Sequence, residues 1–171
     1  MLRLVLTAIG PSAVCVLFPL DPCRKGSPSL FDGAGFVPRF ANNFDARLAR
    51  GSRPATGSDE NEHWLWVKHQ GCDDAGRLAE CHADVALLAV ADMAPPAMLA
   101  KFETAAPVSS ATWMVNFLED AEARSAATNG WWLLRTSAEH AKHGYSSQDM
   151  AVYGKGGVPV IVGRQSVAIF A

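Results

Sequence analysis

The last strand predicted from the sequence carries one uncharged amide on a face that is otherwise apolar. Side chains alternate between the two faces of an extended strand, so one face of this strand holds Ile161, Gly163, Gln165, Val167 and Ile169. A buried glutamine costs stability unless its amide is hydrogen-bonded. Gln165 is therefore either a satisfied structural amide or a working polar group inside a pocket.

An acidic residue follows the most apolar segment of the chain. Apolar residues recur at helical spacing within residues 77–91, namely Leu78, Cys81, Val85 and Leu88. Asp92 continues this stripe four residues after Leu88. The dipole of a helix disfavours a carboxylate at its C-terminus. Asp92 therefore indicates either a functional acid or a frayed helix end whose side chain points to water, and the two interpretations stand equal.

The elements that must position these residues are mostly strands. We expect strands within 40–49 and at 62–69, 108–118, 131–141, 146–153 and 158–170, and a helix over 77–91. On strict alternation, Ser109 and Trp113 share one face of the strand at 108–118. No strand–helix–strand alternation appears, so a doubly wound parallel sheet is disfavoured. The order favours an α+β fold of the hotdog type, with an antiparallel sheet wrapped around one long central helix.

The composition suits one domain with an appendage. The chain has 171 residues, of which 49% are hydrophobic. Residues 21–35 are rich in Pro, Gly and Ser, so we expect residues 1–35 to form an apolar N-terminal segment and linker, and residues 36–171 to form the folded unit. Residues 2–20 are apolar with Arg3 near their start, which resembles a signal peptide, but Pro11 interrupts them. They are too short and broken for a membrane span. A remnant of a preceding domain is at least as good an interpretation as a signal peptide.

Charge and cysteine usage disfavour several functions. The formal net charge is -2 and the basic residues are scattered, so we expect no nucleic-acid partner. The four cysteines form no CxxC pair, and with the histidines they match no common zinc pattern. We therefore expect no metal, no cofactor and reduced thiols in a cytoplasmic protein.

Several short motifs occur in an order that resembles one known family. They are Phe44-Asp45-Ala46-Arg47, Gly57-Ser58-Asp59-Glu60, Ala91-Asp92 before a proline pair, Ser109-Ser110-Ala111-Thr112-Trp113, Trp132-Leu133-Leu134, Ala138-Glu139-His140-Ala141, Gly144 to Met150, and Gly163-Arg164-Gln165. Over roughly residues 36–171 they resemble the acyl-CoA thioesterase-like family of TesB-type, or type II, thioesterases. The resemblance is to the C-terminal one of the two hotdog domains that such proteins carry. Because sites of this family lie between paired hotdogs, it implies an acyl-CoA substrate and a homodimer or higher oligomer.

The resemblance also implies a catalytic site. Type II enzymes use an acid at the end of the helix, a glutamine on the last strand and a hydroxyl on the strand after the helix. Together these groups orient a water that attacks the thioester carbonyl. The matching positions are Asp92, Gln165 and Ser109, with Ser110 as a second placement of the hydroxyl. Because a thioester is already activated, a water with a general base is sufficient and no covalent nucleophile is needed.

Three further residues are expected to contact the substrate, namely Trp113, Tyr145 and Ser146. For Tyr145 and Ser146, capping a strand is an equal alternative. Two functions remain open. The first is hydrolysis of acyl-CoA, and the second is a non-catalytic hotdog module that binds acyl thioesters or serves as one half of a dimer.

Overall fold

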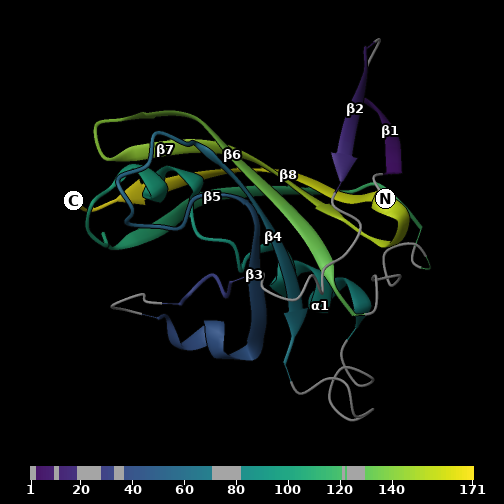
Figure 1. Cartoon of the computed structure of the whole chain (residues 1–171), viewed down its shortest axis with the longest axis horizontal. Coiled ribbons are helices and arrows are strands. Elements are labelled where there is room, and N and C mark those ends of the chain that lie inside the picture. Colours follow the sequence, from purple (N-terminus) through teal and green to yellow (C-terminus); the bar gives the residue numbers. More distant parts are fainter. Residues whose placement is uncertain are drawn as a thin grey trace.

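The computed structural model describes the backbone of residues 3–9 and 12–18, and residues 28–32, 37–70, 82–120, 122 and 130–171 in full. Within these residues the largest element is a six-stranded sheet, shown in Figure 1. A separate two-stranded sheet pairs β1 (Arg3–Ile9) with β2 (Ser12–Phe18) in antiparallel register.

All neighbouring strands of the large sheet are antiparallel. The strands are β3 (Phe44–Gly51), β4 (Glu62–His69), β5 (Val108–Phe117), β6 (Trp132–Lys142), β7 (Tyr145–Tyr153) and β8 (Pro159–Ile169), and their order is β3-β4-β6-β7-β8-β5. Three short 3-10 helices accompany the strands: η1 (Arg39–Asn43) precedes β3, η2 (Ala97–Lys101) precedes β5, and η3 (Lys155–Gly157) lies between β7 and β8. The expected strands are thus confirmed, with small shifts at their ends.

The α-helix that packs on the sheet is shorter than expected. α1 (Ala83–Ala91) has nine residues, and residues 77–81 of the expected helix lie outside the described residues. The expectation of one long central helix is therefore not confirmed. No helix in the described part of the chain combines the length and apolar character needed to cross a membrane.

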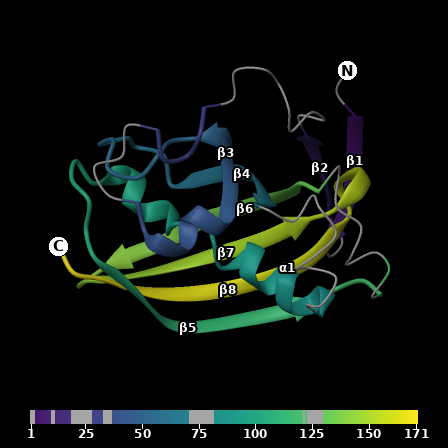
Figure 2. The same cartoon turned by 90° about the horizontal axis from the view of Figure 1, so that it is seen from below.

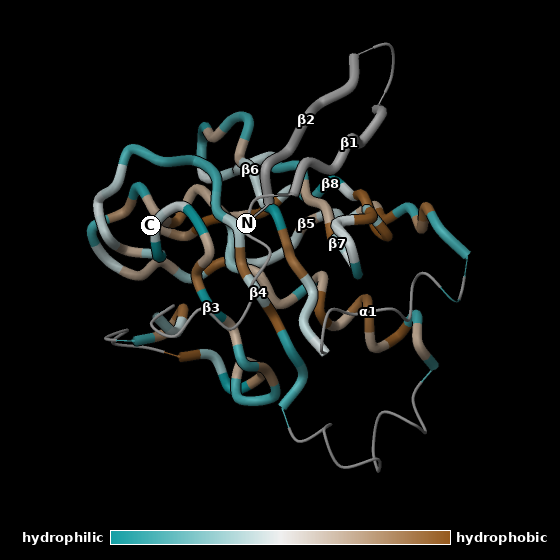
Figure 3. Tube along the Cα trace, turned by 45° about the vertical axis from the view of Figure 1, so that its right-hand side comes forward, coloured by the Kyte–Doolittle hydropathy of each residue, from teal (hydrophilic) through white to brown (hydrophobic). Residues whose placement is uncertain are grey.

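The buried face of α1 also differs from the expected stripe. Val85 is 56% exposed, whereas Leu87, Val90 and Ala91 are buried. The reason is that nearly every position of this helix is apolar, as the brown tube of α1 shows in Figure 3. When all sides of a helix are apolar, the pattern of apolar residues does not show which side packs on the sheet.

The main core lies between α1 and one face of the sheet. Leu87 and Val90 of the helix join Leu65, Leu134 and Ile161 of the sheet in one buried cluster. Figures 1 and 2 both place α1 on this single side of the sheet, which we call the inner face. The sheet packed on a helix gives the general hotdog architecture that the order of elements predicted.

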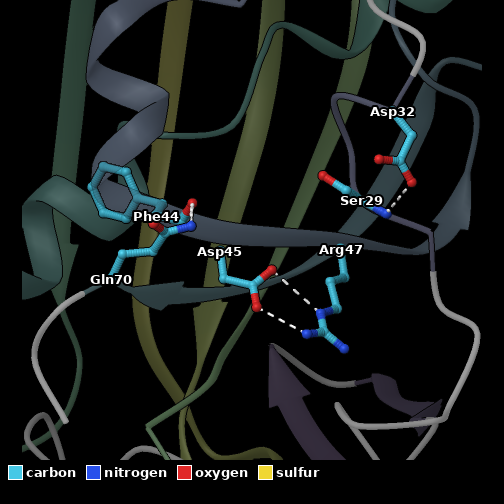
Figure 4. Close-up of polar contacts among 6 residues, drawn as sticks. All are labelled: Ser29, Asp32, Phe44, Asp45, Arg47 and Gln70. Carbon is cyan, nitrogen blue, oxygen red and sulfur yellow. Dashed lines mark hydrogen bonds and ion pairs between the residues drawn. The ribbon is translucent and has the colours of Figure 1, made fainter.

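Part of the expected linker packs on the sheet edge. Leu30 is 2% exposed, and its backbone N–H donates to the Ala46 carbonyl at 2.8 Å. Figure 4 shows this edge, where Asp32 accepts the Ser29 N–H and Asp45 pairs with Arg47 at 2.9 Å. Residues 28–32 therefore contribute to the fold, and a domain boundary at residue 35 stays a prediction.

Two glycines with left-handed backbone provide a test of how tightly β3 and β4 approach. Gly51 has φ +92, and a Cβ there would lie 2.3 Å from the Glu62 carbonyl oxygen. Gly156 has φ +75 and nothing within 4 Å of a Cβ. Alanine costs about 1–2 kcal/mol of backbone strain at either site, but Gly51→Ala adds overpacking of about 1–3 kcal/mol. Urea unfolding of both variants measures the difference, and equal midpoints would contradict the close approach.

Candidate active site

Two glutamines from neighbouring strands meet on the inner face of the sheet. Gln148 of β7 and Gln165 of β8 are register partners, and they are 1% and 8% exposed. Trp113 of β5 is the register partner of Gln165 on the other side. As expected, Gln165 lies among buried neighbours, since Ile161, Val167 and Ile169 on its face are all buried.

A continuous chain of hydrogen bonds satisfies both amides. The Ala97 N–H donates to Gln148 Oε1 at 3.1 Å, and Gln148 Nε2 donates to Gln165 Oε1 at 2.7 Å. Gln165 Nε2 in turn donates to Ser110 Oγ at 2.7 Å. We call these four residues the amide relay. It runs from η2 through β7 and β8 to β5.

A β-bulge decides which serine reaches the relay. Ser110 pairs with Val167 but Thr112 pairs with Ser166, so Ala111 is an extra residue in β5. A bulge reverses the alternation of side chains on one side of it. The expectation that Ser109 shares the face of Trp113 is therefore wrong. Ser109 pairs with Ala168 on the opposite face, whereas Ser110 lies on the face of Gln165.

Asp92 forms the C-terminal cap of α1. Its backbone N–H donates to the Leu88 carbonyl at 2.9 Å, and its side chain reaches solvent. Within the described residues its carboxylate has no hydrogen-bond or ion-pair partner, and no contact given by the structure links it to the amide relay. Its packed surroundings still remove part of its hydration, and this desolvation raises the pKa of the Asp92 carboxyl.

The flanking residues place the end of α1 on the same core as the relay strands. Ala91 and Met93 belong to the buried cluster that contains Met150 of β7, and Trp113 packs against this cluster. Trp113 also donates its Nε1–H to the Met150 sulfur at 2.8 Å.

The three residues expected to contact substrate divide between the two faces. Trp113 is half-buried beside Gln165, and Ser146 is 2% exposed on the same inner face. Tyr145 is 59% exposed and, one residue from Ser146, lies on the outer face. The inner face therefore brings together Gln165, Ser110, Trp113 and Ser146, but not Tyr145.

Two polar residues of the inner face were missed from the sequence. Gln148 could have been found by alternation, because it shares a face with Ser146 and Met150 in the strand at 146–153. His63 likewise shares a face with Leu65 in the strand at 62–69. Gln148 was not predicted because it is a single polar residue in a strand, and His63 was considered only among candidate zinc ligands, which fit no common pattern.

His63 and two hydroxyls are buried without hydrogen-bond partners among the described residues. Both ring nitrogens of His63 lack a partner, as do Thr136 Oγ1 and Ser146 Oγ. His63 and Thr136 are register partners on β4 and β6. Burial lowers the pKa of His63 to about 4, so its ring is neutral at ordinary pH.

The relay leaves two hydrogen-bond donors available at its β5 end. Ser110 Oγ accepts from Gln165, so its own O–H is free to donate, and Gln165 Nε2 carries a second N–H. Donors of this kind can hold a water or stabilise a developing oxyanion. Within residues 28–32, 37–70, 82–120, 122 and 130–171, no group of three or more metal-ligating side chains is gathered.

The chain matches the family model of the acyl-CoA thioesterase C-terminal domain over residues 19–169. Because this match covers most of the chain, the protein belongs to that family, and the resemblance drawn from the motifs is confirmed. None of the curated proteins compared with the chain matches it.

Solved structures share the fold at low sequence identity. A conserved protein of unknown function with a hotdog fold from Alicyclobacillus acidocaldarius has a TM-score of 0.68 and 21% identity, over 96% of this chain and 59% of that one. The tesB protein of Mycobacterium avium subspecies paratuberculosis has a TM-score of 0.55 and 14% identity, over 98% and 57%. A thioesterase family protein from Silicibacter pomeroyi has a TM-score of 0.50 and 14% identity, over 82% and 95%. The chain thus spans less than two thirds of the first two proteins.

The buried neutral His63 predicts a specific loss of stability in acid. In the unfolded chain His63 binds a proton near pH 6.5, but in the folded chain only near pH 4. Stability is therefore lost as the pH falls from 6.5 to 4, by about 3 kcal/mol for a shift of this size. Unfolding free energies of the wild type and His63→Leu across this range measure it. The variant's curve should be flatter, and parallel curves would contradict a buried neutral histidine.

Proposed function

We propose that this chain hydrolyses acyl-CoA to a free acid and CoA, using a water positioned by Asp92, Gln165 and a serine hydroxyl. The observation that carries the proposal is the hydrogen bond from Gln165 Nε2 to Ser110 Oγ on the inner face. Membership of the acyl-CoA thioesterase family supports the reaction class. The proposed reaction consumes only water and needs no cofactor.

Asp92 is the proposed general base. A base works best when its pKa approaches the working pH, and desolvation moves the pKa of Asp92 in this direction. A carboxylate without a partner in the described residues also remains free to accept a proton from water. Since Ala91 and Met93 pack with Met150, the position of Asp92 at the end of α1 is compatible with action near the relay.

Gln165 and Ser110 are the proposed donors. One N–H of Gln165 and the O–H of Ser110 would hold the water or stabilise the oxyanion as the thioester carbonyl becomes tetrahedral. The bulge at Ala111 favours Ser110 over Ser109 for this role. Trp113 and Ser146, on the same face, are the proposed substrate contacts, and Tyr145 would act only at the outer surface.

The edge strand β5 supports a partner hotdog. Within the described sheet β5 has a hydrogen-bonded neighbour only on the side of β8. It also exposes Val108, Met114 and Phe117, and Leu118 follows it. An open edge with exposed apolar side chains favours pairing with another chain. We therefore propose a homodimer or higher oligomer that covers the site at β5.

We also propose a cytoplasmic location, because the four cysteines show no spacing typical of a disulfide framework.

Replacing the proposed base tests the reaction and its mechanism together. Asp92→Asn should lower CoA release from acyl-CoA by about 10²–10⁴-fold, because the amide cannot accept the proton from water. The release of CoA from short, medium and long acyl-CoAs by the purified chain measures it. Asp84→Asn, at the other end of the same helix, is the matched control and should keep activity.

Activity that survives Asp92→Asn would leave a thioesterase with a different base. If the folded, oligomeric wild type releases no CoA from any of these substrates, the hydrolase proposal fails. That result would favour a non-catalytic module that binds acyl thioesters or serves as a dimer half.

The adjacent serines provide a matched pair for the donor. Ser110→Ala should lower kcat on the order of 10²-fold, as expected for loss of one donor at a developing oxyanion. Ser109→Ala removes a hydroxyl from the opposite face and should leave kcat near that of the wild type. Steady-state kinetics of both variants decide the placement. A loss confined to Ser109→Ala would mean that the bulge does not set the active hydroxyl.

A further inference from the structure

We propose that Gln148 is a positioning residue that determines which end of the Gln165 amide faces the site. This inference rests on the proposed function, since it concerns the donor used in that reaction. Gln148 is 1% exposed and contacts Gln165 rather than the open face at Ser110. Its role would therefore be exerted through Gln165.

The orientation of both amides follows from one group that can only donate. A backbone N–H has no acceptor function, so the Gln148 atom that faces Ala97 N must be Oε1. The other end of that amide, Nε2, then faces Gln165 and needs an oxygen there. Gln165 must therefore turn its own Nε2 toward Ser110. The donor character of the Ala97 N–H therefore determines the orientation of two side-chain amides, and the second of them faces Ser110 of β5.

This polarity is the one that the proposed chemistry requires. With Nε2 at the site, Gln165 offers an N–H to a water or an oxyanion, and it leaves the Ser110 O–H free to donate as well. With the amide reversed, Gln165 would turn its Oε1 toward the site, and Ser110 would donate its single O–H to that oxygen. A reversed amide would then repel the negative charge of the tetrahedral intermediate.

An isosteric substitution can reverse the relay. In Gln148→Glu at neutral or higher pH, the carboxylate accepts from Ala97 N–H and can no longer donate to Gln165. Gln165 then turns its Nε2 toward the carboxylate and its Oε1 toward Ser110. When the carboxyl binds a proton at lower pH, its O–H can donate to Gln165 Oε1 and restore the original orientation. Burial favours the protonated form, so the recovery should begin above the usual range of a glutamic acid.

The experiment is the pH profile of kcat and KM for the wild type and Gln148→Glu. We expect the variant to lose on the order of 10²-fold in kcat at high pH, with KM nearly unchanged. The ratio of variant to wild-type kcat should rise as the pH falls. A structural defect would lower the folded fraction without this recovery. A folded variant with wild-type kcat, or with a loss that does not change with pH, would overturn the proposal.

Two additions keep the test decisive. If Gln148→Glu does not fold, Gln148→Met removes the donor without adding charge. A drop in kcat at unchanged KM in this variant supports the proposal, and wild-type kcat overturns it.

If the wild type itself releases no CoA, the proposed function fails separately. The Gln165 side-chain amide protons then provide the test by NMR, because in Gln148→Glu they should shift with the titration of the carboxyl, and no shift overturns the reversal.

Discussion

The hydrogen bond between Gln148 and Gln165 is the interaction on which the inner face depends. Two uncharged amides lie inside a cluster of apolar side chains, where an unpaired amide would cost about 1–3 kcal/mol. The relay pairs them, and it does so only when η2, β5, β7 and β8 keep their present positions. A one-residue slip of β8 would bring Arg164 inside, although Arg164 now pairs with Asp149 and Glu139 on the outer face. The amide bonds and the ion pairs of Arg164 thus both favour the observed register of β8.

The edge of the sheet connects this packing to the proposed activity. β5 contributes Ser110 and Trp113 and is also one of the two edge strands of the described sheet. The bulge at Ala111 divides β5 into two parts whose inner-face side chains make different contacts. On one side of the bulge Ser110 meets Gln165, and on the other Trp113 packs against the cluster that includes the end of α1. A hotdog partner at this edge would cover the donors of the relay and exclude water that does not take part in the reaction.

The sequence predicted the parts of this arrangement that follow from alternation. The strand at 62–69 and the buried face around Gln165 are confirmed, because a period of two in apolar residues is a direct consequence of one buried face. Ser109 was placed on the wrong face because a bulge leaves no mark in an alternating pattern. The exposed side of α1, with Val85, was misassigned because almost all of its residues are apolar. Gln148 was missed because its role depends on Gln165 of the neighbouring strand. The register between two strands does not follow from the sequence of one of them.

The most direct test of the relay is the exchange of glutamine side-chain amides with water. The chain has three glutamines, Gln70, Gln148 and Gln165, so protein labelled with nitrogen-15 at glutamine gives three pairs of side-chain amide signals. Gln70 Nε2 donates to the Phe44 carbonyl at 3.1 Å, but its side chain is exposed, so it serves as the solvent-accessible reference. The relay predicts that the amide protons of Gln148 and Gln165 exchange much more slowly than those of Gln70. Similar exchange rates for all three side-chain amides would contradict a buried, hydrogen-bonded pair, and with it the proposed orientation of Gln165.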